Sequence, residues 1–432
     1  MLKRKATSYI KNWNDTKSRK CLIVQGARQT GKTYIIERFA EDNFEEFVEI
    51  NFKQMPSAAE IFAGDLTVDN MVMAMRFRFP GKHIIPGKTL ILLDEIQECQ
   101  EAVTSLKFWA IDDRYDVIAS GALLGIDYKR ASSYPVDYLR MYGMDFEEFL
   151  WGMGITEDMI DNLRGYLHSK TVIPEAVHSQ MMNYYRQYIA TGGMPEVVQK
   201  YMDTRDFREV DKIQRSLLQG YQYDIAHYAT PEEKVKAEKC YLSVARQMLD
   251  KENHKFQYKE VEHGGRAQKY YSSIEWLLRA DMVHLSRRVT DVRFDLDDYA
   301  RDDFFRAYTT DLSLLMAMKD FSLKQYIVEN TLTGNSKGGI YECAIADALY
   351  KKGYHLYFYK NETTKREIDI IVQKDGEVVP VEVKSGNTRA NSLKSLLNSN
   401  RDIHYGYKFA DSNIGISEDG IITLPLYMAV FI

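Results

Sequence analysis

Eight consecutive residues near the start of the chain could bind a phosphate group. They read G-A-R-Q-T-G-K-T, match the pattern G-x-x-x-x-G-K-[ST], and are Gly26, Ala27, Arg28, Gln29, Thr30, Gly31, Lys32 and Thr33. In such a loop the backbone N–H groups surround a β-phosphate at the start of the following helix. Lys32 would then reach the β- and γ-phosphate oxygens, and Thr33 would bind Mg²⁺. The pattern predicts a nucleoside-triphosphate site.

Two carboxylates end the apolar run Thr89-Leu-Ile-Leu-Leu-Asp94-Glu95. A strand beside the phosphate loop must supply such groups, and Asp94 fits the role of holding Mg²⁺. Glu95 would stand one residue beyond the strand tip, where a carboxylate can orient and deprotonate the attacking water. The alternative is a solvated turn with no catalytic role. The phosphate loop earlier in the chain favours ATP hydrolysis over that alternative.

These residues need a sheet that brings strand ends together. The first 150 residues alternate helical patterns with five apolar runs: Cys21–Val24, Phe47–Asn51, Leu90–Asp94, Val117–Ser120 and Tyr138–Tyr142. Alternation of this kind predicts parallel strands with crossover helices, hence a doubly wound α/β sheet. The fourth run ends with Ser120, whose hydroxyl could position the lytic water beside the γ-phosphate. An ordinary serine at the start of a loop is the alternative interpretation.

A second group of chemistry-bearing residues lies in the last hundred residues. We expect a helix around Gly339–Leu349 and strands at His355–Tyr359, Glu367–Gln373 and Val378–Lys384. A hairpin between the last two strands would bring Asp369 near Glu382, and period-2 alternation would place Glu382 and Lys384 on one face.

This D…E-x-K arrangement is typical of restriction-endonuclease-like folds. There two carboxylates, here Asp369 and Glu382, hold Mg²⁺ against a scissile phosphate while the lysine, here Lys384, stabilises or generates hydroxide. Glu342, on the preceding helix, is placed to add a carboxylate. The alternative is a surface hairpin whose charged side chains face water.

The middle of the chain is predicted to contain two further parts. The pattern is helical from Asp145 to about Thr230, as in a helical lid. From about Lys234 to Leu315 two long helices, a short one and two β-runs, with a turn at Gly264-Gly265, suggest a winged helix-turn-helix. Four basic residues there could meet DNA phosphates: Arg266, Lys269, Arg287 and Arg288. Residues 251–300 nevertheless contain nine Lys/Arg and nine Asp/Glu, so a protein-docking or structural winged helix is the alternative.

Composition narrows the class of protein. The 432 residues are 45% hydrophobic and 28% charged, as in a globular protein of several domains. The net charge of −5 does not indicate a nucleic-acid-binding protein. No apolar run is long enough to span a bilayer, and Met1-Leu-Lys-Arg-Lys-Ala does not start a signal segment, so we expect a cytoplasmic protein without membrane contact. The basic first twenty residues suit a solvated helix, or alternatively a phosphate-binding arm. Four isolated cysteines indicate neither disulfides nor zinc.

Together these motifs resemble a family of prokaryotic AAA-type ATPases, largely of unknown function, that join an ATPase core, a winged helix and a restriction-endonuclease-like domain. The resemblance covers nearly the whole chain through six segments: G-A-R-Q-T-G-K-T, L-I-L-L-D-E-I-Q, A-S-G-A, F-E-E-F-L, G-G-M-P-E-V-V and E-I-D-I-I-V…V-E-V-K-S-G. It implies ATP and Mg²⁺ as cofactors. It implies nuclease activity only by analogy of fold.

The chain departs from the family before F-E-E-F-L. A proline-containing P-L-[ST] is expected there, and Gly143-Met144-Asp145 stands in its place. This loop lies outside the ATP site. Three arginines near the end of the ATPase core are candidates for an arginine finger, namely Arg114, Arg130 and Arg140, and the choice decides whether a homo-oligomer completes the site.

The sequence thus predicts four domains: an AAA-type P-loop ATPase core at 1–150, a helical lid at 151–232, a winged helix at 233–325 and a restriction-endonuclease-like domain at 326–432. The expected function is an ATPase that couples its nucleotide state to a winged helix and a nuclease-like domain, and that acts on DNA or is regulated by it. The rival is a nucleotide-dependent switch that binds protein partners, with an inactive nuclease-like domain as docking scaffold. A small-molecule phosphotransferase is disfavoured by Glu95.

Overall fold

The computed structural model describes residues 2–16, 20–122, 136–249, 255–361, 363–364, 366–386 and 388–432. The chain divides into two compact units. The N-terminal unit comprises residues 3–142 with 279–281, and the C-terminal unit comprises residues 143–278 and 282–432.

The N-terminal unit is built on a parallel sheet. Among the described residues it has five strands in the order β2-β3-β4-β1-β5, every neighbouring pair parallel. Their bounds are β1 Cys21–Gln25, β2 Glu46–Asn51, β3 Thr89–Asp94, β4 Asp116–Gly121 and β5 Val136–Arg140. All five predicted strands are present within one or two residues of their expected bounds, and the predicted parallel sheet is confirmed.

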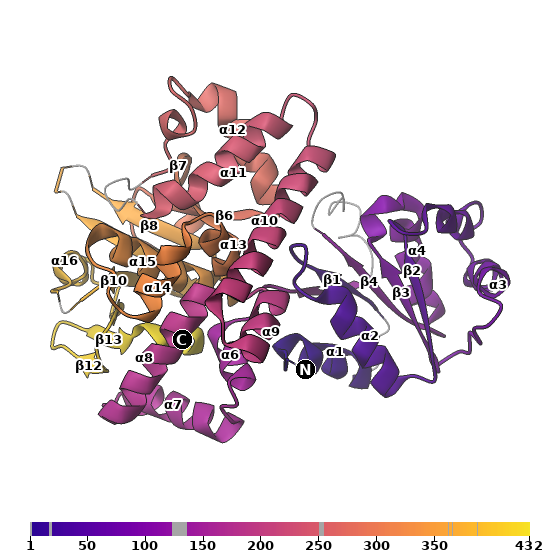
Figure 1. Ribbon diagram of the computed structural model, residues 1–432, viewed down its shortest axis with the longest axis horizontal. Coiled ribbons are helices and arrows are strands. Elements are labelled where there is room, and N and C mark those ends of the chain that lie inside the picture. Colours follow the sequence, from indigo (N-terminus) through magenta and orange to yellow (C-terminus); the bar gives the residue numbers. More distant parts are fainter. Residues whose placement is uncertain are drawn as a thin grey trace. The chain divides into compact units, whose positions relative to one another are not determined.

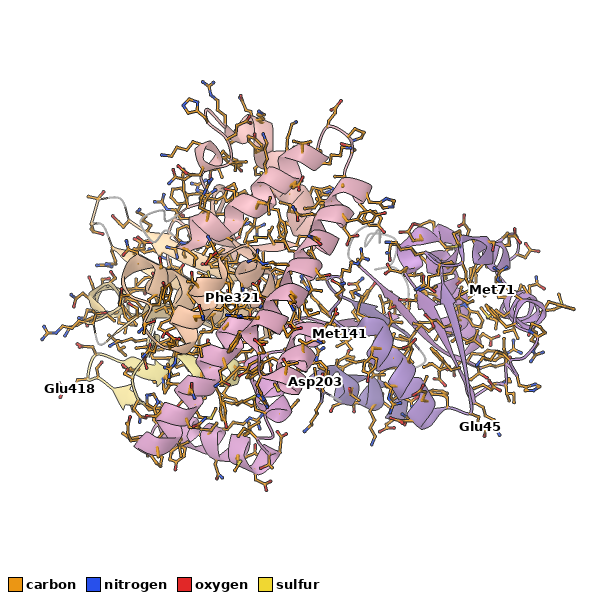
Figure 2. All side chains as sticks on the ribbon, viewed as in Figure 1. Glu45, Met71, Met141, Asp203, Phe321 and Glu418 are labelled. Atoms are coloured by element: carbon orange, nitrogen blue, oxygen red, sulfur yellow. The ribbon has the colours of Figure 1, made fainter. Side chains whose placement is uncertain are left out.

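Helices cover both faces of this sheet (Figure 1). Helices α1 (Lys5–Asp15) and α2 (Lys32–Asn43) pack on one face, and α3 (Val68–Arg78), α4 (Gln100–Asp112) and the 3₁₀ helix η1 (Pro56–Phe62) pack on the other. Met71, a residue of α3 labelled in Figure 2, is fully buried, whereas Glu45, also labelled, lies exposed before β2. Burial on both faces explains why the three central strands, β1, β3 and β4, are mostly apolar.

The C-terminal unit begins with helices, as the sequence predicts for residues 145–230. They are α6 Phe146–Gly152, α7 Glu157–Ser169, α8 Glu175–Thr191, α9 Pro195–Thr204 and α10 Phe207–Tyr228. Asp145 begins α6 with a capping box, since its side chain accepts from Glu148 N while the Glu148 carboxylate accepts from Asp145 N. The Asp at this position, in the loop that departs from the family pattern, therefore supplies the helix cap itself.

The rest of the C-terminal unit surrounds a mixed sheet. Its described strands follow the order β12-β13-β11-β10-β9-β8-β6-β7. The strands are β6 Val283–Val289, β7 Ala300–Thr309, β8 Leu356–Lys360, β9 Glu367–Lys374, β10 Glu377–Lys384, β11 Gly406–Ala410, β12 Gly415–Ile416 and β13 Ile421–Pro425. The helices are α11 Lys234–Leu249, α12 Ala267–Arg279, α13 Leu312–Ala317, α14 Phe321–Val328, α15 Gly334–Lys351 and α16 Asn391–Ser399, with 3₁₀ turns η3 Tyr258–Glu260, η4 Leu296–Tyr299 and η5 Leu426–Phe431.

The predicted winged helix differs from what the structure shows in one respect. Strands β6 and β7 form an antiparallel hairpin, as a wing would, but β6 also pairs in parallel with β8. A two-stranded hairpin alone is marginal in water, and pairing with β8 satisfies the free edge of β6. The hairpin is thus the end of the C-terminal sheet, and this sheet crosses the expected boundary between residues 325 and 326.

A glycine pair in T-G-G-M-P-E joins the helical segment to the rest of this unit. Gly192 has φ 76°, and a Cβ on it would lie 2.0 Å from Ser313 N. A Cβ on Gly193 would lie 2.1 Å from Met144 O, and Gly193 N donates to Asp311 Oδ1 over 2.9 Å. No side chain fits at either position, which explains the glycine pair.

Candidate functional site

The phosphate-binding loop lies between β1 and α2, as the motif predicts. Gly26 has φ 155°, and a Cβ there would lie 2.0 Å from the Met141 carbonyl oxygen, so only glycine fits. Gly31 (φ 88°) and Gln29 (φ 64°) adopt left-handed conformations that turn the chain into α2. The side chains of Arg28 and Gln29 are exposed, so these residues would contribute to the loop through their backbone.

Lys32 closes the loop on itself. Its ammonium donates to Gly26 O (3.0 Å) and Ala27 O (2.9 Å), and Thr30 Oγ1 donates to the same Ala27 carbonyl over 3.0 Å. Burial lowers the pKa of Lys32 from its ordinary value, while the neighbouring Glu95 and Asp94 carboxylates act in the opposite direction. An ammonium group held only by carbonyl oxygens can exchange them for phosphate oxygens, which are better partners for a cation.

Asp94 collects hydrogen bonds from three directions. Its Oδ2 accepts from Thr33 Oγ1 (3.2 Å) and from Asn51 Nδ2 (2.8 Å), and its Oδ1 accepts from the hydroxyl of Ser120. These partners stand at the start of α2 and at the ends of β2 and β4. The oxygens of Thr33 and Asp94 are the hard donors that Mg²⁺ prefers, so this pair fits the predicted ion.

Ser120 is fully buried, and its hydroxyl is directed at Asp94. In this position it orients the Asp94 carboxylate. The role predicted from the sequence, orienting the lytic water, stays a prediction.

Glu95 follows β3 in a left-handed conformation with φ 51°, a rare one for a residue with a side chain. Gln97 Nε2 donates to its carboxylate over 2.5 Å. Strained backbone that surroundings hold in place often occurs at functional positions. The geometry therefore gives Glu95 a fixed orientation at the tip of the strand.

Sequence reasoning missed Asn51 and Gln97. Asn51 pairs directly with Asp94 in the β2–β3 register, which puts both side chains at the same edge of the sheet. The signal was available, because Asn51 is the polar residue that ends an apolar run, as Asp94 does. Gln97 carries no such signal.

Of the arginine-finger candidates, Arg114 is bound to Asp69 (2.7 Å) and Asp112 (2.7 Å) on the surface of the N-terminal unit. Arg140 is the last residue of β5. Arg130 lies outside the described residues. The finger assignment stays a prediction.

The second predicted site forms in part. Strands β9 and β10 are an antiparallel hairpin whose paired residues run as far as Val381 and Ile370, and Glu382 and Asp369 come next on the two strands. Asp369 Oδ2 accepts from Val383 N over 2.9 Å. Glu382 is buried, and its two oxygens meet Lys384 Nζ (2.5 Å) and Leu393 N (3.1 Å), the latter in the first turn of α16. Burial raises the pKa of Glu382, and the Lys384 ammonium opposes that rise.

Glu342 is held by residues of β7. Arg306 Nη1 donates to Glu342 Oε1 (2.7 Å) and to the Asp369 carbonyl (3.0 Å), while Tyr308 OH donates to the same Glu342 oxygen over 3.1 Å. Arg306 Nη2 also donates to Glu367 Oε1 over 2.5 Å. No sequence pattern pointed to Arg306. Glu342 lies near the hairpin and shares this buried guanidinium with Glu367.

Three of the four basic residues of the predicted winged helix contact groups of the C-terminal unit. Lys269 pairs with Glu262 (2.6 Å), Arg287 pairs with Asp302 (3.1 Å), and Arg288 donates to the Lys360 carbonyl (2.8 Å). Arg266 is exposed.

No described helix is long and apolar enough to cross a membrane. Within the described residues no three His, Cys, Asp or Glu side chains are grouped so that they could hold a metal ion. The four cysteines are buried free thiols, as expected.

Three family descriptions match separate parts of the sequence. Residues 18–150 match "AAA domain", residues 182–325 match "Domain of unknown function (DUF8612)", and residues 337–428 match "Domain of unknown function (DUF4143)". No curated protein matches the chain.

Solved structures with low identity also resemble the chain. The Walker-type ATPase paby2304 of Pyrococcus abyssi is 10% identical with TM-score 0.41, over 74% of this chain and 96% of that one. AMPPCP-bound DnaA from Aquifex aeolicus is 11% identical with TM-score 0.30, over 63% of this chain and 87% of its own. A Thermotoga maritima RuvB variant is 11% identical with TM-score 0.31, over 65% and 89%.

The family match and the parallel sheet with its phosphate loop lead to the same conclusion. Residues 18–150 of this chain form an AAA-type P-loop ATPase domain.

Proposed function

We propose that the N-terminal unit binds ATP with Mg²⁺ and hydrolyses it at the loop formed by residues 26–33. The observation that carries the proposal is the convergence of Thr33, Asn51 and Ser120 on Asp94 beside the loop. A buried carboxylate that accepts hydrogen bonds from three side chains is held in a fixed orientation. This is what a magnesium-holding aspartate requires.

The residues divide the chemistry as follows. The backbone N–H groups of the loop and the Lys32 ammonium bind phosphate oxygens, and Thr33 with Asp94 holds Mg²⁺. The bound ion would neutralise charge that develops on the phosphates. Glu95, oriented by Gln97, accepts a proton from the attacking water.

Two variants test this division. Lys32→Ala should lose affinity for a fluorescent ATP analogue, because a charge that contacts phosphate contributes to binding and turnover alike. Glu95→Gln should bind the analogue and stall in hydrolysis, since the amide cannot take a proton. Lys11→Met, an exposed change on α1, is the control. Hydrolysis by Glu95→Gln at the parent rate would reject Glu95 as the base.

For the C-terminal unit we propose a docking role for protein partners, driven by the nucleotide state of the ATPase domain. The supporting observation is that the carboxylates Glu342, Glu367 and Glu382 each already contact a cationic side chain: Arg306 pairs with the first two and Lys384 with the third. A metal ion at Asp369 and Glu382 would have to displace Lys384 from Glu382. The ion pairs of Lys269 and Arg287 also reduce what these residues offer to DNA phosphates.

The competing proposal is metal-dependent cleavage of DNA or RNA at Asp369, Glu382 and Lys384, with Glu342 assisting. It is supported by the positions of Asp369 and Glu382, next to the last residue pair of the hairpin, and by Lys384 beside them. The ATPase rate with and without duplex, single-stranded and branched DNA separates the two. Stimulation by one DNA form favours cleavage, and an unchanged rate with all of them favours protein docking.

A further inference from the structure

Arg4 stands out among the basic residues that begin the chain. Lys3 and Lys5 are exposed, whereas Arg4 is only 7% exposed. It immediately precedes α1, whose Ile10 and Trp13 pack into the cluster that α2 and β1 share. Arg4 is thus not part of a solvated helix face, and its guanidinium is bound to protein carbonyls, unlike a side chain of the phosphate-binding arm that the sequence left open as the alternative.

The guanidinium of Arg4 links two backbone segments of the N-terminal unit. Nη1 donates to the Thr30 carbonyl inside the phosphate loop over 3.0 Å, and Nη2 donates to the Tyr142 carbonyl over 2.8 Å. The Tyr142 segment is itself tied to the loop, since Met141 N donates to Gln25 O over 2.6 Å. A planar fork of donors suits this two-point contact better than an ammonium group does.

The contact between Arg4 and the Thr30 carbonyl also orients the N–H of Gly31, which belongs to the same peptide. In a trans peptide the carbonyl oxygen and the next N–H point in opposite directions. With the Thr30 oxygen held by Arg4, the N–H of Gly31 must point away from Arg4. Gly31 adopts a left-handed φ of 88°. Because glycine has no side chain to restrict its backbone, this peptide needs another contact to fix its orientation.

We propose that Arg4 is a positioning residue for nucleotide binding, which holds the Thr30–Gly31 peptide so that the Gly31 N–H faces the phosphates. The proposal rests on the ATP binding proposed above. Since the loop N–H groups contact phosphate before and during reaction, loss of Arg4 should raise KM for ATP with a smaller effect on kcat. Loss of a charge-assisted hydrogen bond of this kind corresponds to a roughly tenfold or larger fall in affinity for ATP.

The test compares Arg4→Ala, Arg4→Lys and the exposed control Lys11→Met in the full chain. Affinity for a fluorescent ATP analogue should fall about tenfold or more in Arg4→Ala and less in Arg4→Lys. Millimolar guanidinium chloride should restore binding to Arg4→Ala, because the free ion can occupy the vacated position, while equal urea should not. Thermal melting of each variant checks that it is folded.

The outcomes are separable. If the parent itself binds no ATP analogue, the proposed function fails. If the parent binds and Arg4→Ala binds equally well, Arg4 does not position the loop. If Arg4→Ala is weakened but guanidinium does not restore it and Arg4→Lys is equally weak, the residue contributes packing only, and the proposal is overturned.

Discussion

The Asn51 side chain donates a 2.8 Å hydrogen bond to the Asp94 carboxylate from the directly opposite position of the neighbouring parallel strand. Asn51 Oδ1 in turn accepts from the backbone N–H groups of Lys53 and Gln54 over 3.1 and 3.0 Å. Asn51 is thereby fixed at both ends of its amide. It connects the chain that follows β2 to the proposed magnesium-binding carboxylate.

Asn51→Ala should weaken Mg²⁺ binding at the ATP site and so raise the Mg²⁺ concentration that ATP hydrolysis requires. A residue that orients a metal ligand typically contributes on the order of tenfold to a hundredfold in metal affinity or activity. We expect a higher Mg²⁺ concentration for half-maximal rate, measured by titrating Mg²⁺ at saturating ATP. Asn70→Ala, an exposed change on α3, is the control. Equal Mg²⁺ requirements in Asn51→Ala and the parent would remove Asn51 from the site.

DNA binding by residues 233–325 can be tested through its salt dependence. Each lost phosphate contact lowers the slope of log affinity against log salt by about one. Because Lys269 already pairs with Glu262, we expect Lys269→Ala to leave the slope unchanged in a fluorescence anisotropy titration. A slope that is shallower by about one, in Lys269→Ala or in Arg266→Ala, would favour the DNA proposal over protein docking.

The ion pair between Lys384 and Glu382 predicts when the C-terminal unit can bind a metal ion. In Lys384→Met the Glu382 carboxylate loses its partner, so we expect the variant to gain a Mn²⁺ site that the parent lacks. Electron paramagnetic resonance of free Mn²⁺, without nucleotide, measures this. The double variant Lys384→Met with Asp369→Asn should lose the gain, and Lys394→Met, which breaks a surface pair with Asp419, is the control.

Mn²⁺ binding by the parent protein would instead support the nuclease proposal. If the parent binds Mn²⁺ and Asp369→Asn abolishes that binding together with metal-dependent nicking, while ATP hydrolysis continues, the nuclease proposal is correct.

A buried charge cluster predicts how the stability of the C-terminal unit depends on pH. Lys351 pairs with both Asp311 (2.7 Å) and Asp347 (2.8 Å), so one carboxylate is in excess. Burial raises the pKa of Asp347 from 3.8 to about 7, with Lys351 opposing and Asp311 adding to that rise. Between these values the folded protein keeps a proton that the unfolded chain releases. The free energy of unfolding therefore falls as pH rises from 3.8 to about 7.

Asp347→Asn should remove that decline, since the amide does not titrate. Relative to the parent, the variant should gain in melting temperature as pH increases from 5 to 8. Asp203→Asn, an exposed change on α9, is the control for charge removal. Parallel melting curves for parent and variant across this range would contradict the raised pKa of Asp347.

The sequence by itself determined the phosphate loop, the strand that ends at Asp94 with Glu95 after it, and the position of each strand in the first 150 residues to within one or two residues. The physical reason is that these features are local. A glycine-containing loop between a strand and a helix has its conformation set by neighbouring residues, and apolar runs of four or five residues between helical patterns have few alternatives to a parallel sheet.

Only the tertiary structure decided which side chains meet. Arg4 reaches Thr30, Asn51 and Ser120 converge on Asp94, and Arg306 binds Glu342, although each pair is separated by 26 or more residues in the sequence. The hairpin of β6 and β7, predicted to be the wing of a winged helix, likewise belongs to the C-terminal sheet because β6 pairs with the edge of β8. Such pairings depend on strand order and on the matching of buried charges, which no local pattern records.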